Sequence, residues 1–415
     1  MLRLSTGGRA SGTIKGAAED FKVEEITQQG HVLEIGKKYT HDELGIEQKE
    51  GKFAVFVMQK TNWNTIQALK AVARRFRRGV KSTGFAGTKD RTSVSTQLCS
   101  IFGVKPEELS QFHMKDISIN GAWSGGSKVE MGSLIGNRFG ISVKDPSNFD
   151  GLQSIESELG GVFPNYFGEQ RFGYRNINVE VGTDILKGDF KGAALRFLTD
   201  TQNETNEDAN AARNRLAEEM DFSQAMQYFP GYLKYERSMI EYLAKYPNNY
   251  ANSIRKLPRA ISLMFIHSVE ARIFNKVLEE RITNKELATG PGDIVCQENF
   301  YGFPDISNVS KFEDSNGKFT VGSIIGYDTK SITELERQAL DELGLTIESF
   351  KVKGLEELNA KGTYRVLFAP YKDISHNYNQ KQQTLEIGFS LPAGSYATIL
   401  MDELVEVAKI HDTEA

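Results

Sequence analysis

Cysteine is almost absent from this chain of 415 residues, which contains only Cys99 and Cys296. The two are far apart, and neither belongs to a Cys-x-x-Cys pair or a Cys/His cluster, which argues against a disulfide framework and a structural zinc site. The six histidines are scattered, and none has metal-ligand spacing to another. We therefore expect no bound metal, no metal-based catalysis and no histidine-based triad.

Long hydrophobic runs are also missing. No segment resembles a membrane span or a secretory signal, so we expect no membrane association and a cytoplasmic location. The apolar fraction of 39% and the charged fraction of 25% are typical of a soluble globular protein. The glycine-containing stretch from Gly132 to Phe139 lacks both the GxGxxG order and the Lys-Ser/Thr pair of a phosphate-binding loop. This argues against an enzyme with a nucleotide cofactor.

The formal net charge is −5, so binding to a nucleic acid would have to rest on a local basic surface. Such a surface is indicated between residues 70 and 91, where Asp90 is the only acid. The basic residues there are Lys70, Arg74, Arg75, Arg77, Arg78, Lys81, Lys89 and Arg91. This segment is either a solvated helix face or a docking site for a polyanion.

The stretch from Gly84 to Gln97 gathers glycines, opposed charges and hydroxyl groups around Asp90. Before it, apolar residues recur at three- and four-residue steps and predict a helix over 62–78 with Asn64 or Thr65 as its cap. The predicted buried face comprises Ile66, Leu69, Val72 and Phe76. After Asp90 the pattern alternates as in a strand, so we expect the carboxylate in a helix-to-strand connection, where functional groups are often placed.

The length allows two domains with their own cores. Strand-like alternation dominates both ends of the chain, whereas the section from about residue 181 is helical and acidic and includes a long amphipathic helix over 260–282. Two sheet-rich flanks around a helical middle predict one α+β domain interrupted by an insertion. We expect the first part of the domain over 1–180, the insertion over 181–345 and the returning part over 346–415.

A second notable stretch, over 164–173, places three aromatic residues beside Asn, Gln and Arg and separates them with glycines. Such a segment can stack on an extruded base and bind its edge, although a buried aromatic turn would have the same composition.

Several motifs together resemble the TruD family of tRNA pseudouridine synthases, in family order and over nearly the whole chain. They are Lys15 with Glu19-Asp20-Phe21, Gly87-Thr88-Lys89-Asp90 with Thr96-Gln97, Gly136 to Phe139, Asn165 to Gly173, Phe274-Asn275 with Arg281, Gly292-Asp293, and Leu391 to Thr398. Ala18 stands where proline is usual, and His267 to Ala271 also depart from the family pattern. The length resembles archaeal members.

The resemblance implies a pseudouridine synthase catalytic domain with a mixed, mainly antiparallel sheet, interrupted by an α/β insertion domain. It implies an isomerase that flips a uridine out of tRNA, cuts its glycosidic bond, turns the uracil and joins it to the same sugar through carbon, without a cofactor. The expected target is U13 in the D arm, and we expect a monomer. The alternative is an RNA-binding or RNA chaperone protein of the same fold without turnover.

The resemblance also assigns roles to residues. Asp90 is the expected nucleophile, attacking the anomeric carbon or removing a proton to form a glycal, and Lys15 is its expected ion-pair partner. Phe167 is expected to stack on the flipped base, with Asn165 positioning the loop or the base edge. The expected substrate-binding residues are Phe21, Glu19, Arg74, Arg75, Arg77, Arg78, Lys89 and Arg171.

Overall fold

The computed structural model describes residues 1–14, 16–315 and 317–407. Two compact units can be recognised, and each is described by itself. Unit 1 comprises Met1–Leu2, Asn165–Gln297 and Asp305–Leu367, and unit 2 comprises Arg3–Pro164, Glu298–Pro304 and Phe368–Ala415. Among the described residues, none of the helices combines the length and the apolar character that crossing a bilayer requires.

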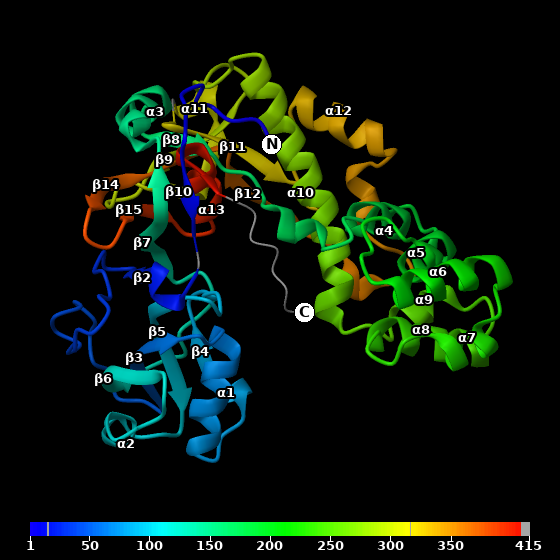
Figure 1. Cartoon of the computed structure of the whole chain (residues 1–415), viewed down its shortest axis with the longest axis horizontal. Helices are drawn as coiled ribbons and strands as arrows, with labels where there is room; N and C mark the ends of the chain where they lie inside the picture. Colours follow the sequence, from blue (N-terminus) through cyan, green and yellow to red (C-terminus); the bar gives the residue numbers. More distant parts are fainter. Residues whose placement is uncertain (15, 316, 408–415) are drawn as a thin grey trace. The chain divides into compact units, whose positions relative to one another are not determined.

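Unit 2 is built on a ten-stranded sheet in the described part of the chain, with the central order β14-β15-β7-β2-β5-β3-β6 (Figure 1). Its strands are β1 (Ala10–Thr13), β2 (Phe21–Thr27), β3 (Phe53–Thr61), β4 (Thr83–Phe85), β5 (Val94–Phe102), β6 (Ile117–Gly125), β7 (Leu134–Ser147), β14 (Lys372–Asn379), β15 (Thr384–Pro392) and β16 (Val405–Val407). The pairs β2–β5 and β1–β16 are parallel. The other described pairs are antiparallel, so the sheet is mixed and mainly antiparallel.

The remaining elements of unit 2 are short. They are the 3-10 turns η1 (Ala18–Asp20), η2 (Val80–Ser82) and η3 (Phe149–Gly151), the helices α1 (Thr65–Arg75), α2 (Pro106–Ser110), α3 (Leu152–Leu159) and α13 (Ala397–Leu404), and the strand pair β8 (Val162–Pro164) and β13 (Phe368–Pro370).

Strand β3 is buried on both faces, as expected for a strand covered on both sides of a sheet. On one face, Phe56 and Met58 pack with Leu69 and Val72 of α1. On the other face, Val57 packs in a cluster with Trp123. Lys60 is an exception at the end of this apolar strand, because its side chain is also fully buried.

Helix α1 is shorter than the predicted span. Of the two residues expected as its cap, Asn64 has this role, because its side chain accepts a hydrogen bond from the Gln67 backbone N–H. Leu69 and Val72 are buried as predicted. Ile66 was predicted wrongly on this face, since it is 52% exposed. Ala68 and Ala73 complete the buried face instead, because small side chains let the helix approach the sheet closely.

Unit 1 is mainly helical. Its helices are α4 (Asn178–Leu186), α5 (Phe190–Thr199), α6 (Glu207–Glu219), α7 (Phe222–Tyr228), α8 (Lys234–Lys245), α9 (Tyr250–Ile254), α10 (Arg259–Thr283), α11 (Phe312–Ser315) and α12 (Glu334–Leu343), with 3-10 turns η4 (Glu169–Phe172), η5 (Ile347–Phe350) and η6 (Glu356–Leu358). A four-stranded sheet of order β10-β9-β11-β12 accompanies them. Its strands are β9 (Ile294–Glu298), β10 (Pro304–Lys311), β11 (Phe319–Ile324) and β12 (Thr363–Val366).

The long helix α10 organises this unit, and the helices α4 to α9 gather at one end of it (Figure 1). The residues expected on its inner face are Ile261, Phe265, Val269, Ile273 and Val277. Ile261 is only partly buried, whereas the other four are buried. Phe265, Val269 and Ile273 join the main core cluster of the unit. The prediction of a long helix is therefore confirmed, but the helix is less amphipathic than expected, because polar residues such as Glu270 and Asn275 are buried as well.

The bounds of the units differ from the expected domain bounds at 180 and 345. Residues 165–180 belong to unit 1, because Phe167 is hydrogen-bonded to Asn275 of α10. Residues up to Leu367 also belong there, because β12 pairs with β11. A change of composition along the chain does not locate such contacts.

Candidate active site

Asp90 lies in the connection between β4 and β5, and is exposed. The prediction of a helix-to-strand connection missed the short strand β4, which pairs with β5. Gly84 in β4 is explained by this packing rather than by a ligand, because a Cβ atom there would lie 2.4 Å from the backbone oxygen of Val129.

The backbone of Asp90 is fixed from two sides. Its carbonyl oxygen accepts a hydrogen bond of 2.8 Å from the Lys60 ammonium group and one of 2.9 Å from the Ser93 hydroxyl. The hydrogen bond from Lys60 is the stronger of the two, because its donor is charged. The buried residues under the connection therefore determine where the exposed carboxylate lies.

Lys89, the neighbour of Asp90, points inward. Its ammonium group lies 2.8 Å from a carboxylate oxygen of Glu25 on β2, and both side chains are almost fully buried. Glu25 also accepts a hydrogen bond from the backbone of Leu98 on β5. Because this ammonium group is already paired, the expected role of Lys89 in contacting substrate is not supported, and its position suits a residue that anchors the Asp90 connection.

A chain of hydrogen bonds joins the same connection to α1. The Thr65 hydroxyl accepts from the Lys89 backbone N–H and donates to the Gln97 side chain, which in turn donates to the carbonyl oxygen of Gly87. Thr65 and Gln97 are both buried. The Gly87–Asp90 motif is thus held from β5 and from the first turn of α1.

A pocket of about 430 Å³ opens beside Asp90, a size typical of sites for small ligands and single residues of larger ones. Its aromatic lining is Phe21, Phe139 and Tyr396, and Asn137 contributes a polar side chain. Lining segments are 86–90 and 393–398, together with Val23, Met131, Gly132 and Leu134. Apolar rings beside an exposed carboxylate can hold a planar base while the carboxylate acts on the attached sugar.

Three other residues were expected near Asp90. Phe21 lines the pocket, as expected of a wall residue. Glu19 is exposed in η1 and is not part of the pocket lining. Lys15, the expected ion-pair partner of Asp90, lies outside the described residues.

Lys60 is the residue that sequence reasoning missed. Burial lowers the pKa of its ammonium group to about 8, with the Asp90 carboxylate opposing this shift and Lys89 adding to it. The available signal was a lysine at the end of a strand that is apolar on both faces, since a buried lysine is rare unless it has a partner.

We predict that turnover at this candidate site falls as the pH rises through about 8, because Lys60 loses its charge above that pKa and its hydrogen bond to the Asp90 carbonyl weakens. Cys99, which also faces Lys60, stays a thiol in this range because burial raises its pKa well above the usual value. The measurement is a pH–rate profile of the wild type, of Lys60→Gln and of the control Lys52→Gln, whose lysine is exposed.

Lys60→Gln should be slow and lack the fall near pH 8, and Lys52→Gln should keep it. A fall that persists in Lys60→Gln would assign the titration to another group.

Phe167 lies in unit 1, where its backbone is clasped by Asn275. The Asn275 side chain accepts a 2.8 Å hydrogen bond from the Phe167 N–H and donates one of 2.9 Å to its carbonyl oxygen. The ring of Phe274 meets the Phe167 ring edge-on at 5.5 Å. This clasp fixes the orientation of an aromatic ring that is only 7% exposed.

Two guanidinium groups cover the Phe167 ring. Arg365 lies 4.4 Å and Arg171 5.2 Å from the ring centroid, distances typical of cation–π contacts. Asn165 is buried. Its side chain donates a hydrogen bond to the Val366 carbonyl oxygen and accepts one from the Arg365 guanidinium group. A base stacking on Phe167 would have to replace one of the two guanidinium groups.

The four arginines after the middle of α1 do not form one group. All four are exposed, but only Arg75, Arg77 and Arg78 line a second pocket in unit 2. In the described part of the chain, no three His, Cys, Asp or Glu residues are grouped so that they could hold a metal ion.

Comparison with known proteins identifies the family. The family model described as "tRNA pseudouridine synthase D (TruD)" matches residues 2–404. A protein of Methanococcoides burtonii named "Probable tRNA pseudouridine synthase D" is 32% identical, with 95% of this chain and 93% of that protein covered. A protein of the same name from Thermococcus sibiricus is 33% identical, with 97% of each covered.

A crystal structure of a TruD protein from Methanosarcina mazei superposes with a TM-score of 0.76 at 29% identity, covering 97% of this chain and 95% of that one. This agreement confirms the predicted fold class, a pseudouridine synthase catalytic domain with an insertion domain. With the family match over almost the whole sequence, it shows that the chain belongs to the TruD family of tRNA pseudouridine synthases, which are isomerases.

Proposed function

We propose that this protein isomerises uridine 13 in the D arm of tRNA to pseudouridine, with Asp90 as the nucleophile. The observation that carries the proposal is the exposed Asp90 carboxylate beside an aromatic-lined pocket, with its backbone held by buried Lys60. The reaction breaks the bond between the sugar C1′ and N1 of uracil and forms a bond from C1′ to C5. The C5 proton is released and N1 takes up a proton, so the reaction needs no further reactant.

Asp90 can act in two ways in this scheme. Its carboxylate attacks C1′ and forms a covalent sugar intermediate, or it removes a sugar proton and forms a glycal. In both routes the carboxylate must be held at the reacting sugar. We propose Lys15 as its ion-pair partner and Lys60, charged below about pH 8, as the cation that holds the Asp90 backbone in place.

We propose that unit 2 is the catalytic domain, that unit 1 is the insertion, and that the protein acts as a monomer in the cytoplasm. Within unit 1 we propose that Phe167 stacks on the extruded uracil. Arg365 is held to Asn165 by hydrogen bonds, so Arg171 is the guanidinium group that we expect to yield its place to the base.

The test of the proposal is tritium release from tRNA labelled at C5 of uridine. Wild-type protein should release tritium from a tRNA with U13 and lose the signal on the same tRNA with C13. Release that is unchanged by the C13 substitution would reject position 13. An absence of release from both would favour the alternative, an RNA-binding or RNA chaperone protein without turnover.

The same assay tests Phe167. Phe167→Leu keeps an apolar side chain in the buried position but removes the ring, so turnover should fall more than tRNA affinity in a filter-binding measurement. Equal losses in both would reject the stacking role.

A further inference from the structure

A second pocket of about 420 Å³ lies in unit 2 where α1 ends and α2 begins. We call it the α1–α2 pocket, and its lining residues are Arg75, Phe76, Arg77, Arg78, Gly103, Val104, Glu108, Gln111 and Phe112. None of them lines the pocket beside Asp90. The two pockets are therefore separate sites within one unit.

The α1–α2 pocket carries a net positive charge. Three guanidinium groups face one carboxylate, in a chain whose formal net charge is −5. Arg78 donates a 2.5 Å hydrogen bond to the carbonyl oxygen of Gly103, which also lines the pocket. In the part of the chain that the structure describes, neither Arg75 nor Arg77 forms an ion pair. Clefts lined by one sign of charge concentrate ions of the opposite sign.

The backbone at Arg77 supports a specific placement of this side chain. Its φ angle of +55° is left-handed, in the position after a helix where glycine is usual. Arg74 and Arg75 lie in the last turn of α1, where a positive charge interacts favourably with the helix dipole. This interaction explains why basic residues stand at these two positions. The helix dipole does not explain why Arg77, beyond the helix, has a left-handed backbone conformation.

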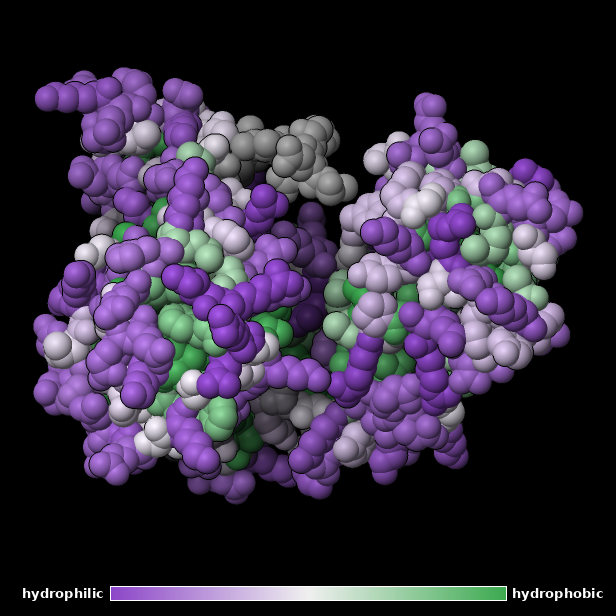
Figure 2. All heavy atoms as spheres, turned by 90° about the horizontal axis from the view of Figure 1, so that it is seen from below, coloured by the Kyte–Doolittle hydropathy of each residue, from purple (hydrophilic) through white to green (hydrophobic). Residues whose placement is uncertain are grey.

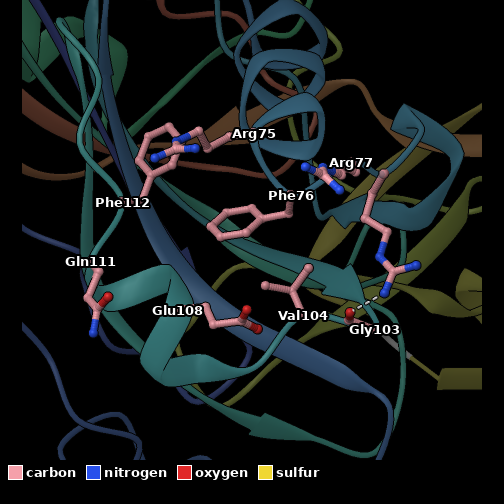
Figure 3. Close-up of a pocket in the computed structure, with 9 residues that line it drawn as sticks. Arg75, Phe76, Arg77, Gly103, Val104, Glu108, Gln111 and Phe112 are labelled. Carbon is pink, nitrogen blue, oxygen red and sulfur yellow. Dashed lines mark hydrogen bonds between the residues drawn. The ribbon is translucent and has the colours of Figure 1, made fainter.

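The floor of the α1–α2 pocket is apolar and aromatic. The rings of Phe76 and Phe112 lie 6.2 Å apart and tilted by 35°, and Phe76 points toward the middle of the site (Figure 3). Phe112 is almost fully buried, whereas Phe76 is partly exposed. A view from below shows hydrophilic side chains surrounding small hydrophobic patches on this side of the molecule (Figure 2). Guanidinium groups around an aromatic ring are the composition that binds a nucleotide of a single strand.

We propose that the α1–α2 pocket binds one unstacked nucleotide of the tRNA at a point outside the Asp90 pocket. Its phosphate lies against Arg75, Arg77 and Arg78, and its base lies over Phe76. Glu108, which also accepts a hydrogen bond from the Lys105 backbone, repels phosphate and accepts from an amino group of the base. This arrangement gives the tRNA a second anchor, and it rests on the proposed function only in naming tRNA as the partner.

The test is the salt dependence of binding between full-length protein and an in vitro transcribed tRNA. Each phosphate contact contributes a slope of about 0.7 in single strands and about 0.9 in duplexes to the plot of log affinity against log salt. Arg77→Gln should weaken binding and reduce the slope by about 0.7. Lys70→Gln is the matched control, because Lys70 is exposed on the same helix outside the pocket. Equal effects of both variants would reject the pocket in favour of general charge attraction.

A second variant tests the base. Phe76→Leu keeps the apolar floor but removes the ring, so affinity should fall by about fivefold to tenfold with no change in the salt slope. Unchanged affinity would reject a bound base and overturn the proposal of a nucleotide site. Binding does not require turnover, so these results stand even if no tritium is released in the assay above, and the two proposals fail independently.

Discussion

Replacing Asp90 with Asn is expected to lower pseudouridine formation by about a thousandfold or more and to leave tRNA affinity nearly unchanged. The amide has the size of the carboxyl group but can neither attack C1′ nor remove a sugar proton. The fold should survive, because Lys60 and Ser93 bind the backbone carbonyl of this residue, and the side chain is exposed. Tritium release measures turnover, and filter binding measures affinity.

The matched control is Asp150→Asn, which removes an exposed carboxylate of unit 2 outside the pocket lining. It should behave as the wild type in both measurements. Substantial tritium release by Asp90→Asn would show that another group carries out the chemistry. Loss of tRNA affinity in Asp90→Asn would instead indicate that the carboxylate shapes the binding surface.

Replacing Lys89 with Met is expected to destabilise unit 2 by about 3–5 kcal/mol, because it leaves the Glu25 carboxylate buried without its partner. The side chains of Lys89 and Glu25 are 3% and 1% exposed and their charged atoms are 2.8 Å apart. Turnover should fall as well, since Lys89 precedes Asp90 in the chain. Urea unfolding followed by tryptophan fluorescence reports on this unit, which contains both tryptophans, Trp63 and Trp123.

A double variant separates the ion pair from other losses. Lys89→Met with Glu25→Gln removes both charges while keeping an acceptor for the Leu98 backbone N–H, so it should regain much of the lost stability. The control Lys22→Met changes an exposed lysine of the same unit and should cost less than about 0.5 kcal/mol. A double variant as unstable as Lys89→Met would show that the pair itself is not the source.

Hydrophobic periodicity predicted the buried side chains well within single helices. The helix period placed Leu69 and Val72 on a buried face, and it placed the inner face of α10. Ile66 was expected on the same face and is exposed, because the buried face of α1 begins at Thr65 and continues through Ala68 and Ala73, which leaves Ile66 outside it. Periodicity gives the direction of a side chain but not the extent of the surface that it meets.

The residue pattern alone indicates an α+β protein of the TruD family and singles out Asp90 within the Gly87–Asp90 motif. These conclusions rest on the types and order of residues, which the chain displays directly. The tertiary structure determines which charged groups are free to contact a substrate and which are paired or buried. It paired Lys89 with Glu25, buried Lys60 under the Asp90 carbonyl and separated Arg74 from the other three arginines. The physical reason is that a charge is bound, buried or exposed according to neighbours from distant segments, and a charge pattern along the chain does not contain those neighbours.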